Sequence, residues 1–241
     1  ISSLGENVTL HYTPNNKNDI FTLTLRYGVG EHEMPLLPYA AMLMENAGIM
    51  GNPALEGKDF DQQIAQLGAA VSYGCNDSYF YISISGEDEN MNKIMNLVNR
   101  QLLMPYLEQK QLDALKGNEF FSRYSRQKRT AVQKSALMQY ALYGKKSAYL
   151  DEVKFIDIWN MDGVQVQRLI ASARTYALDV FYCGTLPEDK LVPELPLTEG
   201  MQPSKSPFVQ DRVTYDKPTV LFLPNSNVQQ ADLYFYINGR P

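Results

Sequence analysis

Histidine and cysteine are both scarce in this chain of 241 residues, which contains two of each. Two cysteines form at most one bridge, so a disulfide-rich scaffold is excluded. The two histidines and two cysteines would build one four-ligand metal site only if all four converged. Glycine, with 15 residues, and proline, with 13, stay within ordinary globular usage. A disordered or collagen-like chain is therefore excluded.

Positive charge is also in short supply. There are 22 Lys and Arg residues against 27 Asp and Glu residues, which gives a formal net charge of −5. We therefore expect no general binding to nucleic acid or anionic membranes. No apolar run approaches the roughly 20 residues that cross a bilayer, so we expect no membrane span. The chain starts at Ile1 and stops just after a strand-like run, which favours a piece of a longer protein.

The apolar residues are present in two kinds of spacing. Alternation predicts strands at residues 8–12, 21–27, 70–73, 79–85 and 178–182. A short polar turn joins the first two strands, so their simplest arrangement is an antiparallel hairpin. Residues 74–77 are expected to supply the next turn.

Helical spacing predicts helices at residues 36–47, 60–67, 91–102 and 163–174. A longer helical stretch covers 107–143, with a break near Arg129 and Thr130. This order of elements is neither a βα alternation nor all-helical. It predicts an α+β fold in which helices cover one face of a mainly antiparallel sheet.

The composition changes after Gly184. Six prolines lie between Pro187 and Pro218, without helical periodicity. We expect a linker or surface-wrapping segment here, assigned to residues 196–211. Strand alternation resumes at 220–222 and 233–237, around a Pro224-Asn225 turn that resembles Pro14-Asn15. We therefore expect one domain over 1–195 and the start of a second, homologous domain over 212–241.

Several segments resemble the pitrilysin, or insulinase, family (M16) of zinc peptidases. In order along the chain they are residues 5–8, 26–30, 48–51, 59–72, 83–86, 102–105 and 143–149. The resemblance covers roughly residues 4–195, and it rests on their shared order and spacing. It implies a metalloprotease fold of the LuxS/MPP-like type, in proteins built from tandem homologous domains.

Active domains of that family carry the motif His-x-x-Glu-His on a helix, with a distant glutamate as a further ligand. The two imidazoles bind one Zn²⁺, and the glutamate between them polarises the metal-bound water. Here the corresponding positions are Met42 and Asn46 around Glu45, and Glu119 stands where the distant ligand falls. Neither Met nor Asn replaces the imidazole pair that Zn²⁺ prefers. We expect no catalytic residue, metal ligand or cofactor in this piece.

The residues alone leave other interpretations open. A helix reading Met42-x-x-Glu45-Asn46 is also typical of an ordinary packed helix with a polar flank. His11 and His32 are expected at the surface, His11 on the polar side of its strand. Cys75 is expected in a turn and Cys183 in an inward-looking strand, as buried or free thiols. A basic run predicts either a solvated helix face or a patch for acidic groups; its members are Arg123, Arg126, Lys128, Arg129 and Lys134.

The resemblance implies the role of a non-catalytic domain. Such a domain pairs with a homologous catalytic domain, of the same or a partner chain, and encloses a chamber that binds peptide or unfolded polypeptide. Strand addition to an open sheet edge is the expected mode, with no contacting residue identified. The parent protein is then a zinc metalloendopeptidase. A bacterial periplasmic or envelope location fits the family and the low cysteine count.

Two alternatives remain. Inactive members of this family also act as structural or assembly scaffolds without a role in peptide binding. An unrelated α+β binding module is the third hypothesis, and it is favoured if residues 220–237 complete the first domain instead of starting a repeat.

Overall fold

The computed structural model describes residues 1–51, 58–198, 200–224 and 231–237. The chain divides into two compact units. Unit 1 comprises Ile1–Gly117 and Phe155–Phe208, and unit 2 comprises Asn118–Lys154 and Val209–Pro241.

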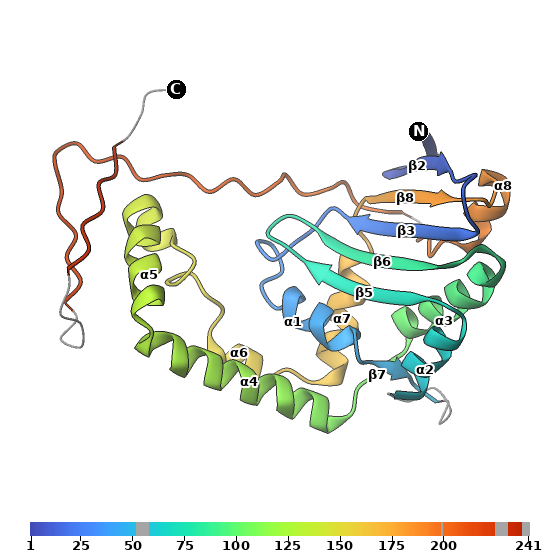
Figure 1. The fold of residues 1–241 in the computed structure, drawn as a ribbon, viewed down its shortest axis with the longest axis horizontal. Coiled ribbons are helices and arrows are strands. Elements are labelled where there is room, and N and C mark those ends of the chain that lie inside the picture. Colours follow the sequence, from blue (N-terminus) through green and yellow to red (C-terminus); the bar gives the residue numbers. More distant parts are fainter. Residues whose placement is uncertain (52–57, 199, 225–230, 238–241) are drawn as a thin grey trace. The chain divides into compact units, whose positions relative to one another are not determined.

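Unit 1 is built on a six-stranded sheet with the order β1-β2-β8-β3-β6-β5 (Figure 1). Its strands are β1 (Ser2–Gly5), β2 (Val8–Pro14), β3 (Ile20–Tyr27), β5 (Ala70–Cys75), β6 (Phe80–Glu87) and β8 (Leu178–Gly184). β2 and β8 run parallel, whereas every other neighbouring pair is antiparallel. A second, two-stranded sheet joins β4 (Gly48–Ile49) to β7 (Pro105–Tyr106). The mainly antiparallel sheet predicted from the sequence is confirmed.

The predicted hairpin between the first two long strands is wrong, because β8 lies between β2 and β3. Tyr12 of β2 is level with Tyr182 of β8, which is level with Leu23 of β3 on its other side. Because β8 lies between them, β2 and β3 are two strand spacings apart, which is about 10 Å. The five residues 15–19 that connect them can span about 17 Å when extended. The loop is therefore long enough to pass the inserted strand. Period-two alternation identifies the face of a strand but not its neighbour.

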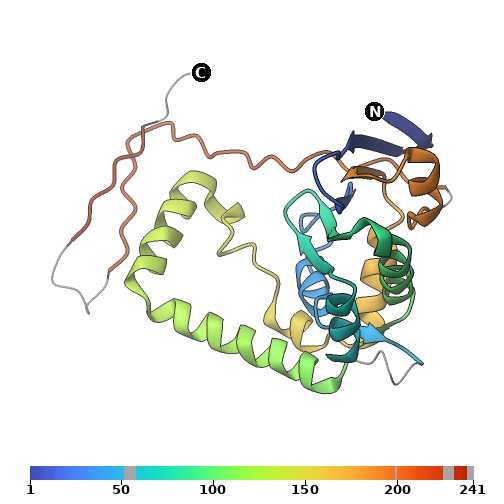
Figure 2. The ribbon, with the colours of Figure 1, turned by 45° about the vertical axis from the view of Figure 1, so that its right-hand side comes forward.

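Four helices cover one face of this sheet (Figures 1 and 2). They are α1 (Leu37–Met44), α2 (Lys58–Gln66), α3 (Met91–Leu103) and α7 (Gly163–Ala173). The burial of side chains along the strands alternates accordingly: Phe21, Leu23 and Leu25 of β3 are fully buried, whereas the residues between them are not. The predicted α+β architecture, with helices on one face, is confirmed.

The remaining helices are α4 (Gln109–Lys128), α5 (Thr130–Tyr143), α6 (Phe155–Trp159) and α8 (Glu188–Leu191). Short 3₁₀ turns occupy Asp88–Asn90, Gly144–Lys146 and Val192–Glu194. The predicted helix break is confirmed, because Arg129 between α4 and α5 has an extended backbone (φ −88°, ψ 118°). No helix in the described ranges is both long and apolar enough to cross a membrane.

Part of the proline-rich segment wraps unit 1. The N–H of Lys205 donates to the carbonyl of Gly28 at 2.7 Å, and the N–H of Phe208 donates to Ser78 Oγ at 2.8 Å. The ring of Phe208 also stacks on His32, with centroids 4.2 Å apart. These contacts correspond to the surface-wrapping form of the predicted connection. The domain limits 1–195, 196–211 and 212–241 stay a prediction.

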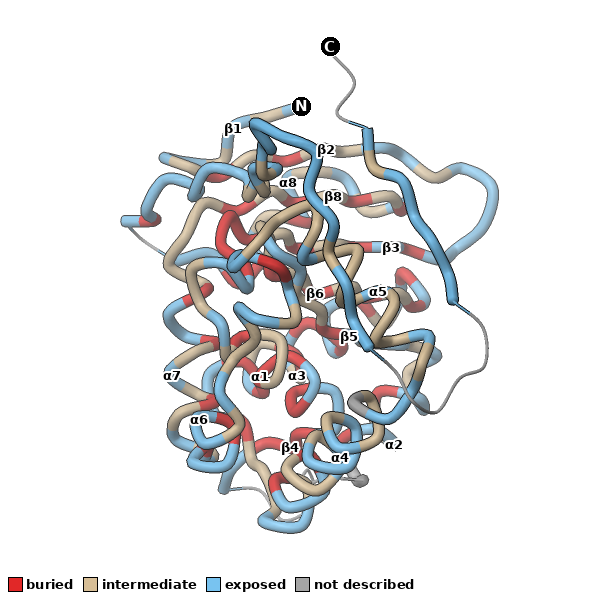
Figure 3. The backbone as a smooth tube through the Cα atoms, turned by 90° about the vertical axis from the view of Figure 1, so that its left-hand side faces the viewer, coloured by how far each residue is buried: buried red, intermediate tan, exposed pale blue. Residues whose placement is uncertain are grey.

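The second strand pair predicted from the sequence is present only as extended chain. Residues 219–224 and 231–237 carry no strand, and most of the intervening turn lies outside the described residues. The two segments run side by side in Figures 1 and 2 and are mostly pale blue in Figure 3. Their alternating apolar side chains are 76–89% exposed; these are Val220, Phe222, Leu233, Phe235 and Ile237.

The two cysteines do not lie where the sequence suggested. Cys75 is the last residue of β5 instead of part of a turn, because the turn is formed by residues 76–79, where the Asn76 side chain accepts the N–H groups of Ser78 and Tyr79. Cys183 alternates with buried Tyr182 and therefore lies on the outer face of the sheet. Both thiols are free.

The close approach between the loop after β3 and the turn after β5 requires glycine at position 30. A Cβ there would lie 2.4 Å from the carbonyl oxygen of Asn76 and 2.5 Å from the backbone nitrogen of Ser78. We expect Gly30→Ala to lower the free energy of unfolding by about 2–3 kcal/mol, since backbone atoms cannot rotate away. Urea unfolding followed by circular dichroism measures this.

Gly117 in α4 provides the matched control, because a Cβ there would meet no atom within 4 Å. Gly117→Ala should raise the free energy of unfolding by about 0.5–1 kcal/mol through helix propensity. Equal effects of the two substitutions would contradict this account of Gly30.

Candidate functional site

Strand β5 forms an open edge of the sheet in unit 1. Among the residues that the structure describes, it pairs with β6 on one side only, from Ala70 opposite Ser85 to Cys75 opposite Phe80. Helix α1 packs against the same strand. An edge strand presents a row of N–H and C=O groups that can pair with another extended chain. β5 is therefore the part of the sheet that is open to strand addition next to α1, the helix singled out by the resemblance.

A cavity of about 180 Å³ lies beside β5. It is lined by residues of β5, of α2 and of the chain around them: Glu45, Phe60, Asp61, Ile64, Ala69, Ala70, Val71, Tyr73 and Gln101. Phe60 and Ile64 are 2% and 4% exposed and form its apolar wall. The sequence did not indicate this cavity, because its lining comes from four separate segments.

Two carboxylates stand at this cavity. Glu45 and Asp61 are both exposed residues, so solvent reaches the lining at these positions. Partial burial raises the pKa of the Asp61 carboxyl above its ordinary value. Neither carboxylate has an ion-pair partner among the side chains that the structure describes. The cavity therefore combines an apolar wall with uncompensated negative charge.

A buried amide holds the cavity lining together. Gln101 of α3 is fully buried, and its Oε1 accepts a hydrogen bond from the Tyr73 hydroxyl of β5. Its Nε2 donates to the carbonyls of Met44 (3.3 Å) and Ala47 (2.5 Å) at the end of α1. Burial raises the pKa of Tyr73, so this hydroxyl stays a proton donor. One side chain thus ties β5, α1 and α3 to one another.

The positions of the peptidase motif do not fit zinc. α1 ends at Met44, and the N–H of Asn46 donates to the carbonyl of Leu43, three residues back, at 3.3 Å. Met42, at 54% exposure, and Asn46 therefore do not stand on consecutive turns of one regular helix. Neither supplies an imidazole. In the described part of the chain, no three His, Cys, Asp or Glu side chains gather closely enough to share a metal ion.

Glu119 belongs to unit 2, whereas Glu45 belongs to unit 1. Its carboxylate accepts a hydrogen bond from Arg123 Nε at 2.6 Å. Arg123 also donates to the carbonyl of Val153 at 2.7 Å and lies 3.5 Å from Glu152. The role of Glu119 in this structure is thus to pair with Arg123.

The other members of the basic run are mostly paired as well. Arg126 bonds Glu152 at 2.5 Å, Lys128 donates to the Tyr124 hydroxyl at 2.6 Å, and Lys134 pairs with Asp232. Such pairs leave little free positive charge for an acidic partner. The structure therefore does not favour a binding patch, and since the Arg123 side chain is only 16% exposed, the run is not a fully solvated helix face either.

The histidines lie at the surface, as expected for side chains outside a metal site. His11 is on the polar face of the sheet, where its ring stacks on Phe181 with centroids 4.5 Å apart. Arg26 lies 4.8 Å from the same phenyl ring and bonds Asp179 at 2.8 Å. Strands β2, β8 and β3 bring these side chains together.

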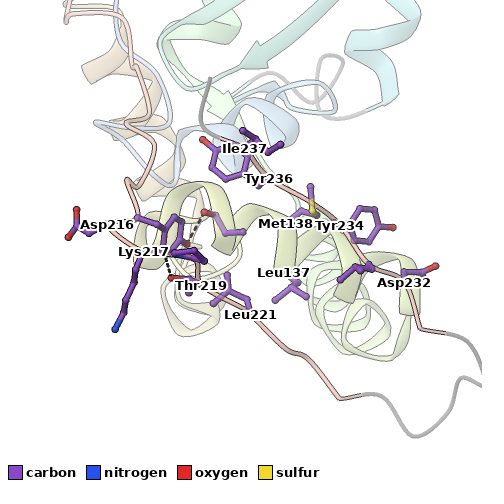
Figure 4. A pocket seen from close by; sticks show the side chains of 14 residues that line it. Leu137, Met138, Asp216, Lys217, Thr219, Leu221, Asp232, Tyr234, Tyr236 and Ile237 are labelled. Carbon is purple, nitrogen blue, oxygen red and sulfur yellow. Dashed lines mark hydrogen bonds between the residues drawn. The ribbon is translucent and has the colours of Figure 1, made fainter. Parts of the chain in front are cut away.

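Unit 2 has a larger pocket of about 520 Å³ (Figure 4). It lies between α5 and the two extended segments, and Leu137, Met138, Tyr234 and Tyr236 are among its lining residues. Tyr215 precedes the first of these segments and attaches the chain there to the helix, since its hydroxyl donates to the carbonyl of Ala141 at 2.9 Å. No pattern in the sequence indicates this pocket, because its two sides lie about 80 residues apart in the chain.

Solved structures share the fold of this chain. A mutant of the ferredoxin protease FusC, in complex with Arabidopsis ferredoxin, matches 85% of the chain with a TM-score of 0.72 and 9% identity. A peptidase M16 inactive domain from Pseudomonas fluorescens matches 87% with a TM-score of 0.66 and 14% identity. The periplasmic protease PqqL from Escherichia coli matches 83% with a TM-score of 0.63 and 15% identity.

These matches cover only part of the longer proteins. The chain spans 23% of FusC and of PqqL and 52% of the Pseudomonas fluorescens protein. The sequence itself matches no protein-family profile and no curated protein. What the structures share is the fold, so this chain has the α+β fold of the M16 inactive domain, a fold that the two proteases also contain.

The buried amide provides a test of how the lining is held. Gln101→Leu leaves the Tyr73 hydroxyl and two carbonyls without their partner, so we expect the free energy of unfolding to fall by about 2–4 kcal/mol. The half-buried Gln167 also donates to one carbonyl, that of Leu103 at 3.0 Å, and Gln167→Leu should cost less than about 1 kcal/mol. Urea unfolding of both variants measures the difference, and similar losses would refute the bridging role of Gln101.

Proposed function

We propose that this chain is a non-catalytic M16-type domain that binds extended peptide at the open edge of β5. It pairs with a homologous catalytic domain, of the same or a partner chain, that hydrolyses peptide bonds, and helps to form the peptide-binding chamber. The observation that carries this proposal is the open edge of β5 beside a cavity, in a fold shared with an inactive peptidase domain.

Strand addition suits a binding site for unfolded polypeptide. The free N–H and C=O groups of β5 offer hydrogen bonds that any peptide backbone can make, whatever its sequence. The strand extends over six residues, from Ala70 to Cys75, which is long enough for a regular ladder. Gln101 accepts a hydrogen bond from Tyr73 of β5 and donates one to the carbonyl of Met44 at the end of α1, so it connects this edge to the helix.

The proposal assigns no hydrolysis and no zinc to this piece. Support comes from Met42 and Asn46 in place of the histidines and from the end of α1 at Met44. Glu119, which stands at the position of the distant ligand, is engaged by Arg123. Zinc is then needed only in the catalytic partner domain.

Residues 212–241 are proposed to begin a second homologous domain. Support comes from the five alternating apolar side chains between Val220 and Ile237, which are 76–89% exposed. In unit 1 the equivalent face of β2 and β3 is covered by helices and completed by β8. A second domain would cover the exposed face in the same way.

A bacterial periplasmic or envelope location is part of the proposal. It is supported by the periplasmic protease PqqL among the structures that share the fold, and by the low cysteine count of two. The partners proposed are a homologous catalytic domain and unfolded polypeptide.

A scaffold of the same fold without a peptide role is the alternative. The coding sequence around these 241 codons separates the two proposals. A His-x-x-Glu-His helix with a glutamate about 75 residues further on, in the same reading frame or a neighbouring one, supports the peptidase assembly. Its absence from both favours the scaffold.

The absence of zinc chemistry is directly testable. After dialysis against metal-free buffer and re-addition of equimolar Zn²⁺, the chain should retain less than about 0.1 zinc per molecule, because no imidazole pair is available. It should also leave fluorescent casein intact. Elemental analysis and the casein assay measure both, and stoichiometric zinc with chelator-sensitive cleavage would overturn the proposal.

The role of the β5 edge is tested by proline. Consecutive residues of a strand direct their N–H groups to opposite sides, so one of Val71→Pro and Ser72→Pro removes a bond to β6 and the other removes a free donor. We expect the variant that keeps its unfolding midpoint to bind fluorescein-labelled casein peptides at least about fivefold more weakly, measured by fluorescence anisotropy.

Ser3→Pro on β1, the opposite edge of the sheet, is the matched control. It should leave peptide affinity within about twofold of the parent chain, because β1 lies five strands away from β5. Equal loss of affinity in the β1 and β5 variants would speak against β5 as the binding edge.

A further inference from the structure

We infer that the cavity beside β5 is a subsite for one basic side chain, Lys or Arg, of a peptide added to that strand. The inference rests on the proposed function and names the class of peptide preferred. It follows from the direction in which a side chain of an added strand points, from the size and walls of the cavity, and from the charge at Glu45 and Asp61.

The pleat of the sheet determines in which direction a side chain of the added peptide points. Val71 and Tyr73 are opposite the buried residues Ile84 and Ile82 of β6, so both point to the helix-covered side of the sheet. Both also line the cavity. Residues directly opposite one another in neighbouring strands project their side chains to the same face. A peptide residue opposite Val71 or Tyr73 therefore sends its side chain toward the cavity.

The volume is that of one long side chain. About 10–15 Å³ of cavity space holds one water molecule, so a cavity of about 180 Å³ has room for a side chain of several non-hydrogen atoms. A lysine side chain has five non-hydrogen atoms and an arginine side chain seven. The apolar wall of Phe60, Ile64 and Val71 suits the methylene stem that Lys and Arg bury beside their charge.

The charge selects a basic head group. Glu45 and Asp61 line the same cavity without an ion-pair partner among the described side chains. An apolar side chain would cover these carboxylates and remove their water without compensation, which costs free energy. An acidic side chain would add repulsion. An ammonium or guanidinium group instead provides the compensating charge and several N–H donors.

The test compares three fluorescein-labelled peptides of Thr, Ser and Val that differ only at one central position, which is Lys, Leu or Glu. A free edge does not impose a register, so each peptide can shift until its central side chain fits the cavity. We expect the full chain to bind the Lys peptide about tenfold more tightly than the Glu peptide, by anisotropy at 50 mM NaCl. Raising the salt to 0.5 M should reduce that ratio.

In the variant Glu45→Gln/Asp61→Asn, the affinity for the Lys peptide should exceed that for the Glu peptide by about twofold or less, while the affinity for the Leu peptide does not fall. The control variant Glu6→Gln/Asp151→Asn changes the net charge equally at exposed positions elsewhere, and it should keep the tenfold ratio. Unfolding midpoints of both variants confirm that they are folded, and the single substitution Glu45→Gln gives an intermediate ratio.

The outcomes separate the two proposals. Equal affinity of the full chain for all three peptides overturns the basic subsite. A Lys preference that both double variants keep, or that both lose, overturns it as well. In each case the proposed peptide-binding edge of β5 is not affected. Failure of every peptide to bind overturns the proposed function together with the subsite.

Discussion

The insertion of β8 between β2 and β3 is the constraint on which the rest of unit 1 depends. It joins what would otherwise be two separate sheets, β1-β2 and β3-β6-β5. Leu178 of β8 is level with Val8 on one side and with Tyr27 on the other, so residues about 170 positions apart share one ladder. The same return of the chain brings α7 against α1. The helices then have one continuous apolar face to cover.

This arrangement leaves β5 as an edge of the sheet, and Gln101 connects that edge to α3 and to the end of α1. A fully buried amide needs partners for its oxygen and its two N–H donors, and it finds them on β5 and at the end of α1. The cavity is the space enclosed by the segments held together in this way. Both of its carboxylates are exposed: Glu45 follows the last residue of α1, and Asp61 lies in α2.

Much of the architecture was predictable from local patterns. The alternation in β3, the stripe in α3 and the break at Arg129 all appear where the sequence indicated them. The pairing of strands was not predictable in the same way, because β2, the strand of Tyr12, shows the same apolar alternation whether β3 or β8 lies next to it. The candidate site was largely hidden as well. Glu45 was singled out by resemblance, and Asp61 lay in a resembling segment without a role of its own. Tyr73 and Gln101 belong to no motif, and all four residues come together only in three dimensions.

By itself, the sequence determined the class of fold, and it contains Met42 and Asn46, neither of which has an imidazole, at the positions that the resemblance assigns to histidines. Periodicity also determined which face of each strand is buried, because burial of apolar surface depends on residue type and spacing. Only the tertiary structure decided that β8 divides the first strand pair, that β5 is an edge, and that Glu45 and Asp61, two carboxylates without an ion-pair partner among the described side chains, line one cavity. The reason is physical: a strand edge and a cavity are properties of packed neighbours distant in sequence, and no local pattern specifies them.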